Sequence, residues 1–136
     1  MIFVIDSNIL ISALIKDSVA RKIIIESEWM YYYPEVAFHE IRKYKEMILE
    51  KSGMTEFEYF ELLDSLLKHI ILVPQEQFSK NLQEANEILG TIDVDDVVFL
   101  AVAMSIQNST IWSNDHHLHQ QHKVMALKTE DVVKLL

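Results

Sequence analysis

The chain has 136 residues, half of them hydrophobic, and carries a formal net charge of −9 at pH 7. This length suits one domain spanning residues 1–136, with enough apolar residues for a core. The absence of cysteine excludes disulfides, cysteine–zinc sites and a thiol nucleophile. Net acidity with few arginines argues against binding of nucleic acid by electrostatic attraction alone, although bound metal ions can supply positive charge.

The sequence also argues against membrane insertion. No stretch reaches the roughly 18 consecutive apolar residues of a membrane span. The apolar segment over residues 1–15 is interrupted by Asp6 and has no basic start, so it does not resemble a signal peptide. We therefore expect a soluble, cytoplasmic protein.

Hydrophobic patterning predicts strands that alternate with helices along the whole chain. In chain order, the expected elements are a strand over 2–5, helices over 8–15 and 18–28, a strand over 29–33, helices over 34–51 and 55–69, a strand over 70–73, helices over 76–89 and within 91–105, a strand over 110–112, a weak strand over 124–127 and a helix over 129–136. Thr55 and Glu58 predict a capping box. This alternation indicates an α/β fold with a parallel sheet and helices on both faces.

Two acids follow predicted strands. Asp6 comes directly after residues 2–5, and Asp115 lies just beyond residues 110–112. In open α/β folds, function collects outside the carboxyl ends of the strands, so both acids are site candidates. The alternatives are local: Asp6 could cap the next helix, and Asp115 lies in a Ser-Asn-Asp sequence typical of turns. Ser113 could orient Asp115 by a hydrogen bond.

Further acids come from predicted helices. Glu40 is either a solvated helix residue or borders the packed side, because apolar neighbours cover much of that helix. The stretch TIDVDDVVFLAVAMS, residues 91–105, places three aspartates before a long apolar run. A helix start stabilises one or two acids, whereas three repel one another unless a cation lies among them. We expect Asp93 to cap the helix, Asp95 to face solvent and Asp96 to point into a site.

Together these features resemble the PIN-domain family of metal-dependent ribonucleases, which includes toxins of bacterial and archaeal toxin–antitoxin pairs. The resemblance spans essentially the whole chain and rests on four motifs in order: VIDSNIL, FHEI, DDVVFLAVA and WSND. It implies a three-layer fold whose five-stranded parallel sheet has the order 3-2-1-4-5. The first and fourth strands would then be neighbours.

The same resemblance implies an acidic catalytic cluster. It assigns catalysis to Asp6, Glu40, Asp96 and Asp115, binding of Mg²⁺ or Mn²⁺ to Asp6, Asp96 and Asp115, and supporting roles to Asn8, Ser113 and Asp93. Glu40 would position the attacking water. The leading prediction is therefore metal-dependent hydrolysis of RNA phosphodiester bonds. The expected partners are RNA, a protein antitoxin and a second copy of the chain.

One position departs from the family pattern. Members often have a further acid or Asn two or three residues beyond the position of Asp115, where this chain has His117 and Leu118. The cluster would then hold one metal firmly and a second only with substrate. Few side chains are candidates for contacting phosphate: Lys16, Arg42, Lys43, Lys45 and the histidines, His116 among them.

The loop DHHLHQQH places four histidines close together: His116, His117, His119 and His122. Imidazole suits zinc or nickel, but we favour an exposed loop. A third possibility is that His116 or His117 contacts substrate phosphate beside Asp115.

Two other functions are compatible with the pattern. A PIN-fold subunit that binds or regulates without cleaving would suit the missing downstream acid and the net charge of −9. A phosphate-accepting, receiver-like domain also clusters acids at strand ends. However, Glu40 would have no role in such a domain.

Overall fold

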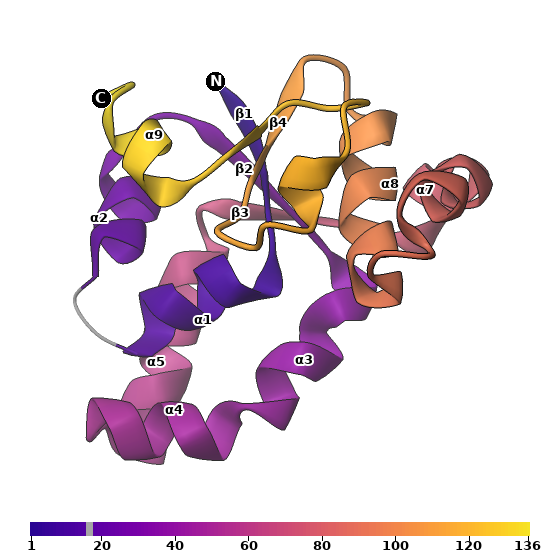
Figure 1. The fold of residues 1–136 in the computed structure, drawn as a ribbon. Coiled ribbons are helices and arrows are strands. Elements are labelled where there is room, and N and C mark those ends of the chain that lie inside the picture. The colour runs from indigo at the N-terminus through magenta and orange to yellow at the C-terminus, as the bar shows by residue number, and fades with distance from the viewer. Residues whose placement is uncertain (16–17) are drawn as a thin grey trace.

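A computed structural model describes residues 1–15 and 18–136. In these residues, five parallel strands form one sheet in the order β3-β2-β1-β4-β5. The strands are β1 (Ile2–Ile5), β2 (Met30–Pro34), β3 (Ile70–Val73), β4 (Ser109–Trp112) and β5 (Ala126–Leu127). The predicted strand order is confirmed, and helices cover both faces of the sheet (Figure 1).

The helices follow the predicted alternation with the strands. They are α1 (Ser7–Ile15), α2 (Val19–Glu26), α3 (Phe38–Lys43), α4 (Lys45–Ser52), α5 (Glu56–Leu67), α6 (Gln75–Phe78), α7 (Leu82–Leu89), α8 (Val97–Ser105) and α9 (Thr129–Val133). The 3₁₀ turns are Glu35–Ala37, Ser79–Asn81, Val94–Asp96 and Leu118–Gln120. None of the helices described is both long enough and apolar enough to cross a bilayer.

The sheet separates two cores because successive strand side chains point to opposite faces. Phe3 and Ile5 of β1 pack in one core with residues of α1, α2, α4, α5 and α9. Val4 packs in the other core, with residues of α6, α7 and α8. In β2, Tyr31 and Tyr33 are fully buried in the first core. Both faces of the central strand β1 are covered, which explains why β1 is a continuous apolar run.

The single long helix predicted over 34–51 is wrong. Pro34 ends β2, and a 3₁₀ turn, α3 and α4 follow, with a break at Tyr44 (φ −98°, ψ 8°). Neither glycine nor proline marks this break, so the residue pattern could not reveal it. Both short helices lie against α1, and Ile41 and Ile48 are both buried in the same core. The bend therefore lets the apolar faces of α3 and α4 pack on the same core. A straight helix would carry one of these faces away from that core.

The helix predicted over 76–89 also divides, into α6 and α7 with the turn Ser79–Asn81 between them. All three segments contact α8, so the chain bends around that buried helix. The weak strand over 124–127 shortens to β5, and the last helix ends at Val133. The capping box is confirmed: Glu58 N–H donates to the Thr55 hydroxyl, and Thr55 N–H donates to the Glu58 carboxylate.

Candidate metal centre

The pairing of β1 with β4 brings the first acid next to the WSND motif. Ile5 lies opposite Trp112 in the sheet, so the residues that follow them meet at the carboxyl edge. The Ser113 hydroxyl donates to Asp6 Oδ2. The same hydroxyl oxygen accepts the backbone N–H of Asp115 at 3.0 Å. Ser113 therefore connects Asp6 with the loop that carries Asp115, through the backbone of that loop.

Asp6 has two structural partners besides its place at the strand end. It is only 3% exposed, and its Oδ1 accepts the backbone N–H of Ile9 at 3.0 Å, as a helix cap does. The hydroxyl of the next residue, Ser7, lies 2.6 Å from the Tyr33 hydroxyl. The two sequence-based interpretations of Asp6 are thus compatible, because one carboxylate caps α1 and also faces the pocket described below.

Two carboxyl groups of this region hold protons unusually strongly. Burial raises the pKa of Asp6 to about 6, with smaller contributions from the charges of Asp115 and Glu40. Burial also raises the pKa of Asp96 to about 8, followed by repulsion from Asp93 and Asp115. Raised pKa values in one acidic cluster mean that the negative charges are costly there. A cation placed among them would relieve that repulsion.

The stretch over residues 91–105 has the geometry expected of its three acids. Asp93 caps the turn Val94–Asp96, where its Oδ1 accepts the backbone N–H of Asp95 at 2.9 Å. Asp95 is exposed, whereas Asp96 is 7% exposed. Among the residues described, Asp96 Oδ2 is buried without a hydrogen-bond partner. A buried carboxyl oxygen without a partner is unusual, and a cation placed beside it would satisfy it.

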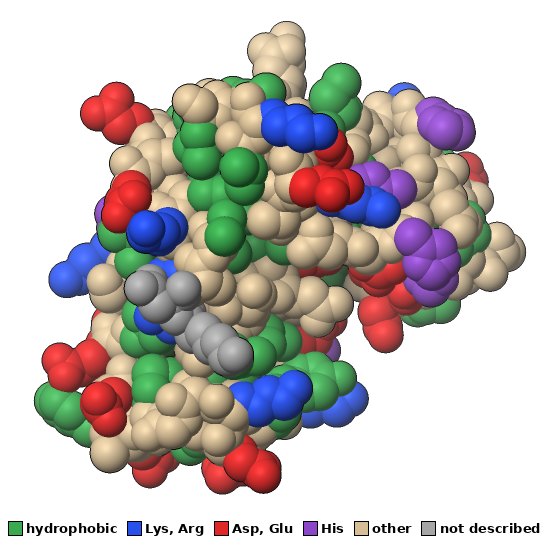
Figure 2. Space-filling model, turned by 60° about the vertical axis from the view of Figure 1, so that its left-hand side comes forward, with side chains coloured by type: hydrophobic (Ala, Val, Ile, Leu, Met, Phe, Trp, Pro, Cys, Tyr) green, Lys and Arg blue, Asp and Glu red, His purple; other side chains and the backbone are tan. Residues whose placement is uncertain are grey.

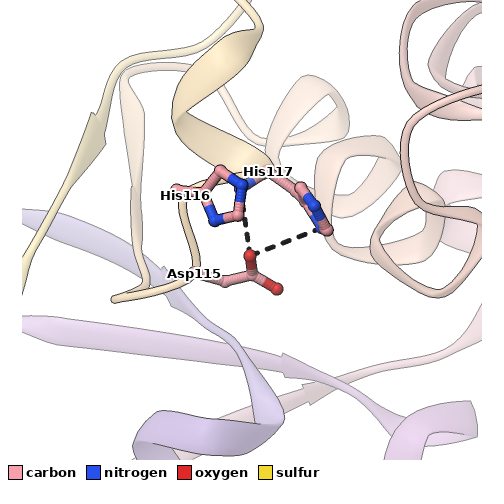
Figure 3. A group of neighbouring side chains, drawn as sticks. All are labelled: Asp115, His116 and His117. Atoms are coloured by element: carbon pink, nitrogen blue, oxygen red, sulfur yellow. Dashed lines mark hydrogen bonds and ion pairs between the residues drawn. The ribbon is translucent and has the colours of Figure 1, made fainter.

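His117 lies among these acids, whereas the sequence analysis favoured an exposed histidine loop over a metal site and did not include His117 in the acidic ligand set. Its Nδ1 is 3.0 Å from Asp93 Oδ2 and 3.6 Å from Asp115 Oδ1. Its backbone N–H donates to Asp115 Oδ1 at 3.0 Å, so the loop folds back over that carboxylate (Figure 3). Burial acts to raise the pKa of Asp93, but hydrogen bonds from His117 and from the Asp95 N–H lower it overall. One signal in the sequence pointed here: His117 stands where the family often has another acid.

The donor atoms that lie closest together differ from the predicted ligand trio of Asp6, Asp96 and Asp115. One ligand atom from each of Asp93, Asp96, Asp115 and His117 lies within 4.8 Å of all the others. Asp6 and Glu40 are not in that group, although both line the same pocket. A second group joins Asp115 and His117 with His116, whose ring packs against that of His117 at a centroid distance of 4.3 Å. Carboxylate-rich donors around an orphaned oxygen fit a divalent cation.

A pocket of about 270 Å³ opens beside this cluster. It is lined by Asp6, Ser7, Asn8, His39, Glu40, Lys43, Tyr44, Asp93, Asp95, Asp96, Phe99 and Asp115. The four predicted catalytic acids therefore share one pocket, to which α3 contributes Glu40. Asn8, predicted to support the carboxylates, is an exposed lining residue.

The candidate phosphate contacts are dispersed. Lys43 lines the pocket, whereas Arg42 is exposed on α3 and is not a lining residue. His116 is exposed on the loop after β4, and Lys45 is held in an ion pair with α5. Lys16 lies outside the described residues. Among the described residues on the face shown in Figure 2, acidic and basic side chains are interspersed, without a continuous basic patch.

The four histidines of the loop do not converge on one point. The Nε2 of His119 lies 2.8 Å from the carbonyl oxygen of Ser113, and His122 is exposed. Within the described residues, the candidate metal groups include His116 and His117 but neither His119 nor His122. A four-histidine site is therefore not formed in this part of the chain.

Comparison with known proteins agrees with the fold and the motifs. A family model described as PIN domain matches residues 4–134. The match covers nearly the whole chain and all four motifs, so the resemblance drawn from the sequence is confirmed. A search of curated proteins gave no match.

Proposed function

The chain belongs to the PIN-domain family, and we propose that it is a metal-dependent endoribonuclease. Family membership indicates a nuclease-type activity in general; the metal, the RNA substrate and the toxin-like role are our proposal. One observation carries it: Asp6, Asp96 and Asp115 line one pocket, and an oxygen of Asp96 is buried there without a partner. Such an arrangement suits a bound cation and is unfavourable without one.

Mg²⁺ or Mn²⁺ would supply the Lewis acidity and positive charge that phosphodiester hydrolysis requires. In our proposal Asp96 and Asp115 hold the ion, and Asp6 completes the site. Both Asp6 oxygens already accept a hydrogen bond, but a carboxylate oxygen has capacity for a further contact. Ser113 and the start of α1 keep the Asp6 carboxylate oriented toward the others.

We assign the remaining steps to α3, which borders the pocket. Glu40 would orient the attacking water and accept its proton, since it is a half-buried carboxylate among the lining residues. Lys43 follows three residues later on the same helix and also lines the pocket, so it can contact a phosphate oxygen. The Ser113 hydroxyl accepts the Asp115 N–H, and the His117 N–H donates to the Asp115 carboxylate, so both residues fix the loop that presents Asp115.

The proposal extends to the setting of the reaction. RNA is the substrate class, the cytoplasm the location, and a protein antitoxin the inhibitor, as in the toxin-like branch of the family. We also propose a homodimer, which is supported by the exposed aromatic side chains of Phe57 and Phe60 on α5, 72% and 48% exposed. Exposed aromatic residues on one helix are typical of protein interfaces.

Incubation with a mixed pool of structured and single-stranded RNAs tests the proposal. Wild type should cleave with Mn²⁺ or Mg²⁺ and not with EDTA, and Asp6→Asn and Asp115→Asn should lose the activity. Asp64→Asn is the matched control, because Asp64 is an exposed acid on α5 and is not among the residues that line the pocket. It should cleave like wild type.

A folded wild type that is as inert as both variants, with either ion, would overturn the nuclease proposal. The alternative is then a binding or regulatory PIN-fold subunit. The net charge of −9 and the dispersed basic residues favour that alternative. Cleavage that persists in EDTA would contradict the role of the metal.

A further inference from the structure

A histidine nitrogen lies within the acidic cluster and changes the kind of ion that suits it. His117 Nδ1 is 3.0 Å from Asp93 Oδ2 and 3.6 Å from Asp115 Oδ1. Ligands of one octahedral ion, each at about 2.1 Å, lie about 3.0 Å apart when adjacent and about 4.2 Å apart when opposite. Both measured distances fall in that range. With Asp96, these residues place four ligand atoms within 4.8 Å of one another.

A second observation points independently to a ligand at this place. Asp96 is more than nine-tenths buried, and its Oδ2 finds no donor in the described part of the chain. His117 lies beside Asp93 and Asp115 but gives no hydrogen bond to Asp96. An ion bound between His117 and the three acids would satisfy that oxygen directly.

The donor set determines the class of ion. Mg²⁺ selects oxygen ligands almost entirely, whereas first-row transition metals accept imidazole nitrogen readily. A neutral imidazole can carry its hydrogen on Nε2 and present the Nδ1 lone pair to a metal. Nδ1 is the nitrogen that faces the carboxylates of Asp93 and Asp115.

We propose that Asp93, Asp96, Asp115 and His117 form a mixed nitrogen–oxygen site that binds transition-metal dications such as Mn²⁺ in preference to Mg²⁺. This inference rests on the proposed function for the assumption that an ion is bound. The preferred kind of ion follows from the ligand atoms alone. It assigns His117 and Asp93 as ligands, and it places the preference for the metal in the loop after β4. That preference would come from the imidazole nitrogen of His117, which adds a nitrogen donor to three carboxylates.

Direct binding tests the proposal without any cleavage assay. Isothermal titration with Mn²⁺ and with Mg²⁺ gives the two affinities, and pulsed electron paramagnetic resonance of bound Mn²⁺ detects a coordinated ¹⁴N nucleus. Wild type should show the ¹⁴N coupling and bind Mn²⁺ at least about tenfold more tightly than Mg²⁺. His117→Gln should lose the coupling and most of the Mn²⁺ preference, while its Mg²⁺ affinity changes little.

His122→Gln is the matched control, because His122 is exposed in the same loop and belongs to neither candidate group. It should keep both the coupling and the preference. His116→Gln tests the other group, and loss of the coupling in that variant, with retention in His117→Gln, would overturn the proposal. So would a wild type without ¹⁴N coupling. Circular dichroism of each variant confirms that it is folded.

The two proposals fail in different ways. Nitrogen-coupled Mn²⁺ binding without any RNA cleavage would overturn the endoribonuclease and leave the mixed site standing. Metal-dependent cleavage by a wild type that shows no nitrogen coupling would overturn the mixed site and leave the endoribonuclease standing.

Discussion

Replacing Asp96 by Asn should stabilise the metal-free protein at neutral and higher pH. In the folded chain the pKa of Asp96 is raised from 3.8 to about 8, first by burial and then by the charge of Asp93. The folded state therefore keeps a proton that the unfolded state releases, and this contribution to stability falls as pH rises from about 4 to about 8. At pH 7 the difference corresponds to about 4 kcal/mol as an upper limit.

The expected gain is smaller than that limit. Part of the repulsion is shared with Asp93 and Asp115, and the new amide must still be accommodated in a buried place. Its NH₂ group can donate to neighbouring carboxylates, which an ionised Asp96 cannot do. We expect Asp96→Asn to gain about 1–3 kcal/mol at pH 8, which is about 3–10 °C in Tm for a domain of this size.

Thermal unfolding followed by circular dichroism in EDTA, at pH 4.5 and at pH 8, measures this effect. Asp96→Asn should melt above wild type at pH 8 and close to it at pH 4.5, where Asp96 is protonated in the folded state. Asp95→Asn, on the same turn but exposed, should show little difference at either pH. Adding Mn²⁺ should raise the Tm of wild type more than that of Asp96→Asn.

A lower Tm for Asp96→Asn at pH 8 in EDTA would refute the reasoning, because it would mean that the ionised carboxylate is well satisfied in the metal-free fold. A gain of equal size at both pH values would show that the amide packs better for reasons unrelated to charge.

Three further substitutions separate the site from the fold. Ser113→Ala removes the hydroxyl that donates to Asp6, so denaturant unfolding should show a loss of about 1–3 kcal/mol, with reduced cleavage. Tyr33→Phe removes a buried, hydrogen-bonded hydroxyl beside the start of α1, and the same measurement should show a loss of about 1–2 kcal/mol. Thr55→Ala breaks the capping box with Glu58, so thermal melts should show a free energy of unfolding lower by about 1 kcal/mol. Cleavage at 25 °C should stay unchanged.

Local chemistry made much of the fold predictable. Apolar runs followed by acids located β1 and the edge where the site forms, and Thr55 with Glu58 predicted the start of α5. Strand order came from the family resemblance and not from periodicity, which cannot say which strands are neighbours. The break at Tyr44 was missed because every residue around it is compatible with a helix. Contacts with α1, far away in the sequence, decide the bend there.

The positions of the acids could be predicted from the sequence, whereas the position of the histidine could not. Helix-start chemistry and charge repulsion predicted the cap at Asp93 and the difference in exposure between Asp95 and Asp96. Four histidines in one loop look alike in sequence, and what distinguishes His117 is its hydrogen bond to Asp93, 24 positions away. Only the packed loop shows which ring faces the acids.

The hydrogen bond between Ser113 and Asp6 joins residues 107 positions apart. Translation proceeds from the N-terminus, and N-terminal parts generally begin to fold first. Asp6 and Glu40 are therefore made early, but they cannot meet Asp96 and Asp115 until β4 has been synthesised and has paired with β1. A ribosome-bound chain that stops before that strand holds scattered acids and no assembled centre. The acidic centre therefore assembles only after β4 has been added to the sheet beside β1.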